Sequence, residues 1–191
     1  MRRTAPALFA LALGAAAGPA AAAKYDIDPL HTYPSLEFSH MGISVWRGKF
    51  TKTAGTLKLD QKKKSGSIDV RIDPASIDFG LAAMDEKARS DDFMNVAKYP
   101  TARYQGKLKW DGDTLKRVEG KLTFMGQTKP LSLSVNSFKC IEHPFYKKEA
   151  CGADAEGDMN WGEWGMKQSQ WGQGDAGKLH LRIQVEGIKK D

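Results

Sequence analysis

The sequence predicts an all-β protein, an antiparallel barrel with an apolar interior and one short helical segment across or beside an opening. Apolar and polar residues alternate in segments spread along the chain, as when Ile68, Val70 and Ile72 stand between polar neighbours. The same pattern recurs at 103–110, 131–136 and 179–186. It is typical of strands with one buried face. A sheet that curls onto itself buries all these faces and leaves few free edges.

The first 23 residues are expected to be a secretory signal peptide. Arg2 and Arg3 precede an apolar run at 7–17 that is too short to span a membrane, and small residues follow up to Ala23. Cleavage after Ala23 leaves residues 24–191 as a single domain. We therefore expect a soluble, exported protein.

Charge offers little evidence of a macromolecular partner. The 191-residue chain carries a formal net charge of +6, and its densest basic run is Lys62, Lys63 and Lys64. This run lies between two apolar stretches, where a solvated hairpin turn is expected. A nucleic-acid groove would show a basic stripe mixed with aromatic residues, so no nucleic acid is expected. Transient contact with anionic lipid headgroups stays open.

One stretch favours a helix. Residues 81–89 are rich in helix formers, a short turn at 90–96 follows, and Pro100 opens the next strand. Within an otherwise all-strand pattern, this segment should lie over an opening or a flank. Leu81, Met84 and Phe93 would then close part of the interior.

Two cysteines, Cys140 and Cys151, flank a short loop. In an exported chain the expected outcome is one disulfide. Metal ligation is the alternative, although the chain has no C-x-x-C pair or second ligand cluster close in sequence. The sequence contains no nucleophile elbow, P-loop or zinc-protease motif, and we expect no enzymatic activity.

His40 shares its strand face with Leu36 and Phe38, so it should point into the apolar interior. It is either a core histidine with a local partner or a group near a ligand headgroup at the barrel mouth. Trp161, Trp164 and Trp171 lie in a glycine-rich loop that is either a mobile lid or a packed connection. The other bulky apolar residues suit either a core or a ligand site.

Several motifs resemble those of one family. They lie at residues 25–32, 38–42, 92–100 and 120–130, the last reading GKLTFMGQTKP. In this order they are similar to motifs of the YceI-like, or polyisoprenoid-binding, family of bacterial periplasmic proteins, and they span nearly the whole mature chain. Cys140 and the CGAD string from Cys151 resemble a disulfide-bearing subgroup.

The resemblance implies an extended lipocalin-like barrel that binds a polyisoprenoid, an isoprenoid quinone or a fatty amide for transport or storage. A bound long-chain lipid is then expected and no other cofactor. Many relatives carry arginines where this chain has Met84 and the 160–166 segment, so we expect a neutral headgroup. The candidate lumen residues are Leu36, Phe38, His40, Ile43, Trp46, Phe50, Phe79, Leu81, Met84, Phe93, Tyr104, Phe124, Phe138, Trp161, Trp164 and Met166.

Two other classes of function stay open. An enzyme acting on an isoprenoid or lipid would need His31 or His40 to meet a carboxylate such as Asp28 or Asp85. An interaction module would use the Trp/Gly loop to recognise a sugar or a membrane. Pairing of two barrels into a homodimer is also open.

Overall fold

A computed structural model describes residues 22–166 and 177–191 of the chain. Nearly all of the expected signal peptide, and Trp171, lie outside these residues. The elements are β1 Ala23–Ile27, β2 Tyr33–His40, β3 Ser44–Phe50, β4 Thr53–Asp60, β5 Ser65–Ile72, η1 Pro74–Ser76, β6 Ile77–Asp78, α1 Ala82–Arg89, β7 Ala102–Asp111, β8 Thr114–Phe124, β9 Gln127–Glu142, β10 Glu149–Asn160, η2 Trp161–Trp164 and β11 Lys178–Lys189.

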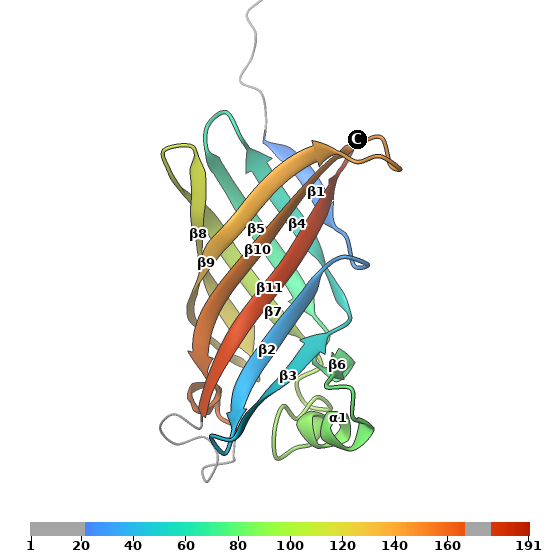
Figure 1. Cartoon of the computed structure of the whole chain (residues 1–191), viewed down its shortest axis with the longest axis vertical. Helices are drawn as coiled ribbons and strands as arrows, with labels where there is room; N and C mark the ends of the chain where they lie inside the picture. Colours follow the sequence, from blue (N-terminus) through green and yellow to red (C-terminus); the bar gives the residue numbers. More distant parts are fainter. Residues whose placement is uncertain (1–21, 167–176) are drawn as a thin grey trace, which may run out of the picture.

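Eight antiparallel strands close into a barrel, which confirms the predicted fold class (Figure 1). They follow the order β1, β4, β5, β7, β8, β9, β10, β11, and β11 returns to β1 through pairs such as Tyr25 with Lys189. Every strand of the ring therefore has a hydrogen-bonded neighbour on both sides, and the barrel has no free edge.

β11 has two partners in succession on the same edge. Residues 187–189 pair with β1, whereas residues 180–184 pair with β2. β2 continues into β3, and β3 pairs with the short β6. These strands extend one side of the wall beyond the ring.

The two ends of the barrel differ. The turns at 61–64, 112–113 and 143–148 lie at one end, which we call the disulfide end, and α1 and η2 lie at the other, the helix end (Figure 1). The Lys62–Lys64 segment is the expected hairpin turn between β4 and β5. At the helix end Met125 and Gly126 both have positive φ, 48° and 75°, as a two-residue type I′ hairpin requires.

The predicted alternation decides which residues face the interior. Ile68, Val70 and Ile72 face it from β5, and Leu131, Leu133 and Val135 from β9, while the intervening polar residues face outward. The other two alternating segments behave alike, apart from one residue. Trp110 follows a register shift at Lys109, and it packs at the disulfide end against Phe138 instead of lining the cavity.

The predicted helix is present and covers the flank beside β3 and β6 (Figure 1). Asp85 Oδ1 accepts a hydrogen bond from the Phe79 amide at 2.7 Å, which ties the helix to the end of β6. Leu81, expected to close the interior, is instead exposed at the helix start, and buried Met94 lines the cavity. No helix within the described residues has the length and apolar composition to cross a membrane.

Candidate ligand cavity

The barrel encloses an apolar cavity that runs along its axis. The volume of the cavity is about 160 Å³. Lining residues come from both ends, with Leu115 and Cys151 at the disulfide end and Phe124 and Met166 at the helix end. The apolar lining includes Ile27, Leu36, Phe50, Leu57, Ile68, Val70, Ile72, Met94, Ala102, Tyr104, Leu108, Leu115, Val118, Leu122, Phe124, Leu131, Leu133, Val135, Phe138, Ala155, Met159, Met166, Leu179, Leu181, Ile183 and Val185.

The few polar groups in the lining are already hydrogen-bonded within the protein. The Tyr104 hydroxyl lies 3.2 Å from the Val118 carbonyl oxygen and 3.1 Å from that of Leu131. Burial raises the pKa of this phenol far above its ordinary value, so Tyr104 stays neutral. The Thr32 hydroxyl donates to the Glu186 carbonyl and accepts from the Glu186 amide. The cavity therefore presents mainly hydrocarbon to its contents.

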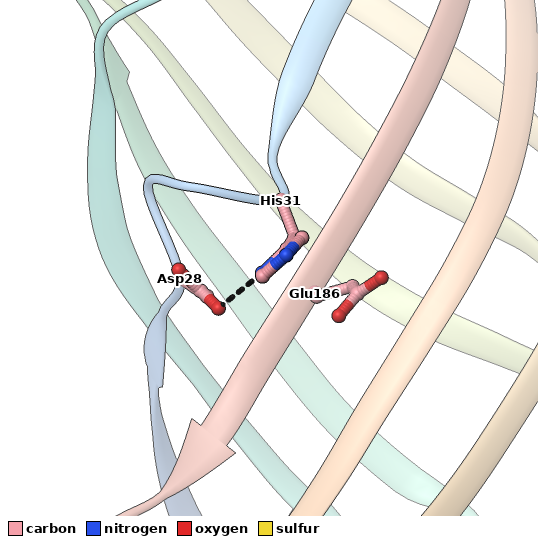
Figure 2. A group of neighbouring side chains, drawn as sticks. All are labelled: Asp28, His31 and Glu186. Carbon is pink, nitrogen blue, oxygen red and sulfur yellow. Dashed lines mark hydrogen bonds and ion pairs between the residues drawn. The ribbon is translucent and has the colours of Figure 1, made fainter. Parts of the chain in front are cut away.

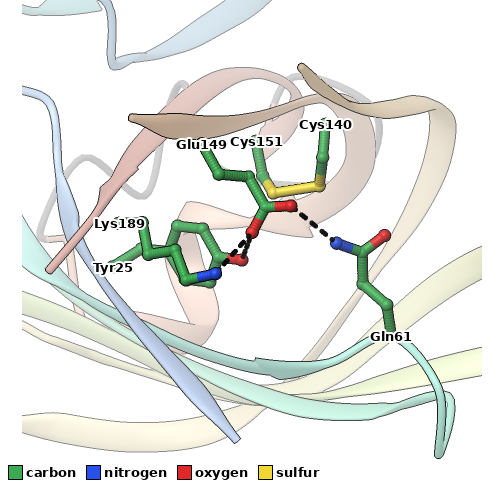
Figure 3. Close-up of a disulfide and its surroundings, with 6 residues drawn as sticks. All are labelled: Tyr25, Gln61, Cys140, Glu149, Cys151 and Lys189. Atoms are coloured by element: carbon green, nitrogen blue, oxygen red, sulfur yellow. Dashed lines mark hydrogen bonds and ion pairs between the residues drawn. A yellow bond between two sulfur atoms is a disulfide. The ribbon is translucent and has the colours of Figure 1, made fainter. Parts of the chain in front are cut away.

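A set of hydrogen bonds and the disulfide lie together at the disulfide end. Tyr25, only 1% exposed, donates from its hydroxyl to Glu149, which also accepts from Lys189 Nζ at 3.3 Å (Figure 3). Burial, followed by the Glu149 carboxylate, raises the pKa of Tyr25, and the hydrogen bond from Tyr25 lowers the pKa of Glu149. Two positions further along the same strand pair, the expected disulfide joins Cys140 of β9 to the directly opposite Cys151 of β10.

An aromatic cluster packs at the helix end. Phe38 lies at its centre, with ring centroids 6.3 Å from Trp46, 6.1 Å from Phe79 and 5.7 Å from Trp161. Phe93 packs edge-on to Trp161 at 6.3 Å. The cluster joins the β2–β3 hairpin, the loop after α1 and η2 into one apolar layer beside the cavity.

Trp161 and Trp164 are buried in η2, so residues 161–164 form a packed connection. The Asn160 side chain caps this turn by accepting from the Gly162 amide at 2.9 Å. The indole N–H groups of Trp161 and Trp164 have no hydrogen-bond acceptor among the described residues. Two buried donors are thus left unpaired near the helix end of the cavity.

The predicted lumen residues fall into three groups. Those that line the cavity are Leu36, Phe50, Tyr104, Phe124, Phe138 and Met166. Those that form or adjoin the helix-end aromatic cluster are Phe38, His40, Trp46, Phe79, Phe93, Trp161 and Trp164. Those outside both are Ile43, Leu81 and Met84.

Ile43 and Leu81 are 78% and 54% exposed and do not face the interior. Ile43 sits at the tip of the β2–β3 hairpin, beyond the wall, and Leu81 occupies the N-cap of α1. Strand parity does not extend through a hairpin tip, so it does not apply to Ile43. Leu81 was expected inside because the helical segment would cover an opening or a flank, but it lies at the solvent-exposed start of α1. His40 is half-buried against Trp46, at a centroid distance of 5.2 Å, and does not line the cavity.

Small residues of the lining escaped the sequence analysis. Ala102 and Ala155 are buried and line the cavity. Gly120 permits the Tyr104 ring to lie flat against the wall, because a Cβ there would be 2.5 Å from the Tyr104 hydroxyl oxygen. Alternation alone would have placed Ala155 inward, but choosing candidates by bulk passes over residues whose small size creates the space.

A charged cluster lies at the junction of β1 and β2 with β11. Asp28, His31 and Glu186 each offer a nitrogen or oxygen atom of the kind that binds metal ions, and these atoms lie within 4.8 Å of one another (Figure 2). His31 Nδ1 lies 2.7 Å from Asp28 Oδ2, and this hydrogen bond raises the pKa of His31. Burial would raise the pKa of Asp28, but the hydrogen bonds from His31 and the Leu30 amide outweigh it and lower the value.

The contact between Asp28 and His31 is the pairing of a histidine with a carboxylate that an enzyme acting on a lipid would need. Metal binding needs a neutral imidazole, whereas this pair favours the charged form. Neither side chain lines the cavity. The contact is best described as an ion pair that fixes the turn between β1 and β2.

Comparisons with known proteins agree with this architecture. Residues 25–186 match the family model described as a YceI-like domain. Protein YceI of Escherichia coli O157:H7 is 35% identical over 179 residues, covering 91% of each chain. A UPF0312 protein of Pseudomonas aeruginosa strain LESB58 is 34% identical over 191 residues, covering 96% of this chain and 97% of that protein.

Solved structures share the fold. The Campylobacter jejuni YCEI protein is 24% identical, with a TM-score of 0.66 over 81% of this chain and 91% of that chain. BcnA of Burkholderia cenocepacia is 18% identical, with a TM-score of 0.66 over 84% and 98%. A polyisoprenoid binding domain from Saccharophagus degradans is 10% identical, with a TM-score of 0.59 over 88% and 99%. On the strength of the family model and the curated relatives, this chain belongs to the YceI-like family.

Proposed function

We propose that the protein is a periplasmic carrier or store that binds the apolar chain of one long molecule, without catalysing a reaction. The observation that carries this proposal is the enclosed cavity, whose lining is hydrocarbon and whose few polar groups are satisfied within the protein. Burial of a methylene gains about 0.8 kcal/mol. A hydrocarbon tail can therefore bind there without strong polar contacts.

The size of the cavity limits the part of the ligand that it encloses. The 160 Å³ is close to the volume of a cavity of about 150 Å³ that holds one benzene ring, so it accommodates about six carbon atoms. A chain of that length fits without rearrangement. A longer polyisoprenoid or quinone tail would leave part of its length outside or displace side chains at one end.

The indole N–H groups of Trp161 and Trp164 at the helix end, like that of Trp110 at the disulfide end, have no acceptor among the described residues; although none of the three lines the cavity, a neutral headgroup that carried a carbonyl to one of them would supply the acceptor. A buried donor without an acceptor costs about 1–3 kcal/mol, which a ligand carbonyl could recover. Quinones and fatty amides both offer such an oxygen. Trp161→Phe keeps an aromatic ring and removes the N–H, so it should weaken a quinone ligand more than a saturated hydrocarbon of the same length.

Native mass spectrometry of protein purified from the cell envelope tests the binding function. We expect a fraction of the protein to carry one apolar adduct, which organic extraction releases. The stripped protein should then bind the polyene probe cis-parinaric acid, and the extracted lipid should displace it. Protein without an adduct that also leaves the probe unbound would overturn the proposal.

Export is part of the same proposal. Fractionation of cells that produce the full chain should place the processed protein in the periplasm, beginning near Lys24. Unprocessed protein in the cytoplasm would contradict it.

A further inference from the structure

The β9–β10 loop at the disulfide end presents apolar side chains to solvent. Phe145 is 85% exposed, and Ile141 and Tyr146 are about half exposed. Single exposed apolar residues are ordinary on a protein surface, but Phe145 and Tyr146 of the loop and Ile141 at the end of β9 lie within six positions and form a patch.

The conformation of this loop is fixed. His143 Nδ1 accepts hydrogen bonds from the amides of Phe145 and Tyr146, each at 3.3 Å, and the Tyr146 ring stacks on the imidazole at 4.4 Å. The His143 amide donates to the Lys148 carbonyl at 2.8 Å, and the Lys147 amide donates to the His143 carbonyl at 2.9 Å. These contacts fix the loop in a conformation that holds Phe145 exposed to solvent.

The neighbouring β4–β5 turn adds positive charge to the same surface. Gln61 Nε2 lies 3.4 Å from Glu149 Oε2, which brings that turn beside the start of β10 (Figure 3). The turn carries Lys62, Lys63 and Lys64, and the β9–β10 loop carries Lys147 and Lys148.

Two of these lysines keep their charge uncompensated. Lys63, Lys64 and Lys148 each form an ion pair with an aspartate. Lys62 and Lys147 form no ion pair with any described residue. The surface therefore combines exposed aromatic rings with free ammonium groups.

The exposed apolar residues at the opposite end have a different setting. Met41, Ile43 and Val45 are exposed on the β2–β3 hairpin, but no lysine or arginine lies between residues 38 and 46. The basic residues Arg47 of β3 and Lys87 of α1 at that end form ion pairs with Glu37 and Asp92.

From this juxtaposition we propose that the disulfide end docks on the surface of a bilayer that contains anionic phospholipid. Phe145 and Tyr146 enter the interface between headgroups and acyl chains, where aromatic side chains are enriched. Lys62 and Lys147 lie over the phosphate groups, whose negative charge attracts each ammonium group. This docking goes beyond ligand binding in the cavity and does not depend on whether the cavity is filled.

Sedimentation with vesicles tests the docking. The processed protein is mixed with vesicles of phosphatidylcholine alone or with one quarter phosphatidylglycerol. We expect binding to the anionic vesicles only, weakened about tenfold by Phe145→Ser, because one exposed aromatic anchor is lost. Ile43→Ser is the matched control, since it removes an equally exposed apolar residue from the other end and should leave binding unchanged.

The double variant Lys62→Gln with Lys147→Asn tests the charge. Asn suits position 147, whose φ is 53°. About tenfold to thirtyfold weaker binding is expected at low salt, with little difference from wild type at high salt. Probe binding in the cavity should be unchanged in every variant, which separates this proposal from the carrier function.

Three results would overturn the docking proposal. In the first, wild-type protein does not bind anionic vesicles. In the second, Phe145→Ser binds them as tightly as wild type. In the third, Ile43→Ser loses more vesicle affinity than Phe145→Ser does. Concentration-dependent self-association abolished by Phe145→Ser, without vesicle binding, would assign the patch to a second copy of the chain instead.

Discussion

Filling the cavity from its wall should separate ligand binding from folding. Ala155 is buried on β10, and it lines the cavity. In Ala155→Phe the new ring brings about six carbons into a space that holds about as many. At about 0.8 kcal/mol per displaced methylene, the lost burial amounts to about 5 kcal/mol, or more than a thousandfold in affinity.

Rearrangement of the ligand would recover part of this loss, so at least a hundredfold weaker binding of cis-parinaric acid is expected. Folding should respond in the opposite sense. In ligand-free protein the added ring fills a void, and the free energy of unfolding from urea titration should stay constant or rise. Ala54→Phe is the control, because Ala54 is exposed on β4 and should alter neither quantity.

The two measurements together decide the interpretation. If Ala155→Phe lowers the free energy of unfolding by about 1–3 kcal/mol, as overpacking of a solid core does, and leaves probe affinity unchanged, the interior is not the binding site.

Three further predictions concern stability. Gly120→Ala should cost about 1–3 kcal/mol, because its Cβ would lie 2.5 Å from the Tyr104 hydroxyl oxygen and 2.7 Å from the Gln105 carbonyl oxygen; in a Tyr104→Leu background, urea unfolding should show a smaller cost, with the contribution of the Gln105 backbone remaining. Cys151→Ala removes a disulfide that joins residues 11 positions apart, and it should lower the free energy of unfolding by about 3 kcal/mol. Wild-type protein with its disulfide reduced should lose the same amount. His31→Asn should lose a pH-dependent stabilisation. Because Asp28 raises the pKa of His31, that stabilisation is complete below the ordinary value of 6.5 and disappears as the pH rises through the folded-state value; parallel wild-type and variant stability curves from pH 5 to pH 9 would refute it.

The wall of the barrel was predictable because strand parity is a local property. Leu131, Leu133 and Val135 each face the interior, as their alternation indicates. The prediction failed where the backbone leaves strand geometry, at the exposed hairpin tip of Ile43, whereas Trp110 packs against the core at the disulfide end in spite of the register shift before it. Hydrophobicity shows that a residue tends to be buried, but not against which element.

The space inside the barrel could not be predicted from sequence. It is the difference between the area that the strands enclose and the volume of the side chains that enter it, so small residues such as Ala102 matter as much as large ones. The Asp28–His31–Glu186 cluster depends on a pairing between the two ends of the chain. The pairing is set by closure of the barrel, which alternation indicates without giving the register.

Because β11 pairs with β1 and with β2 along one edge, the circumference of the barrel and its length are set by different strands. The last residues of β11 complete the circumference through β1, while its middle residues carry β2, and through β2 the β3 and β6 extension. Insertions in that extension would deepen the tube without adding a strand around it. Relatives built on the same ring could then accommodate tails of different length by changing one side of a single rim.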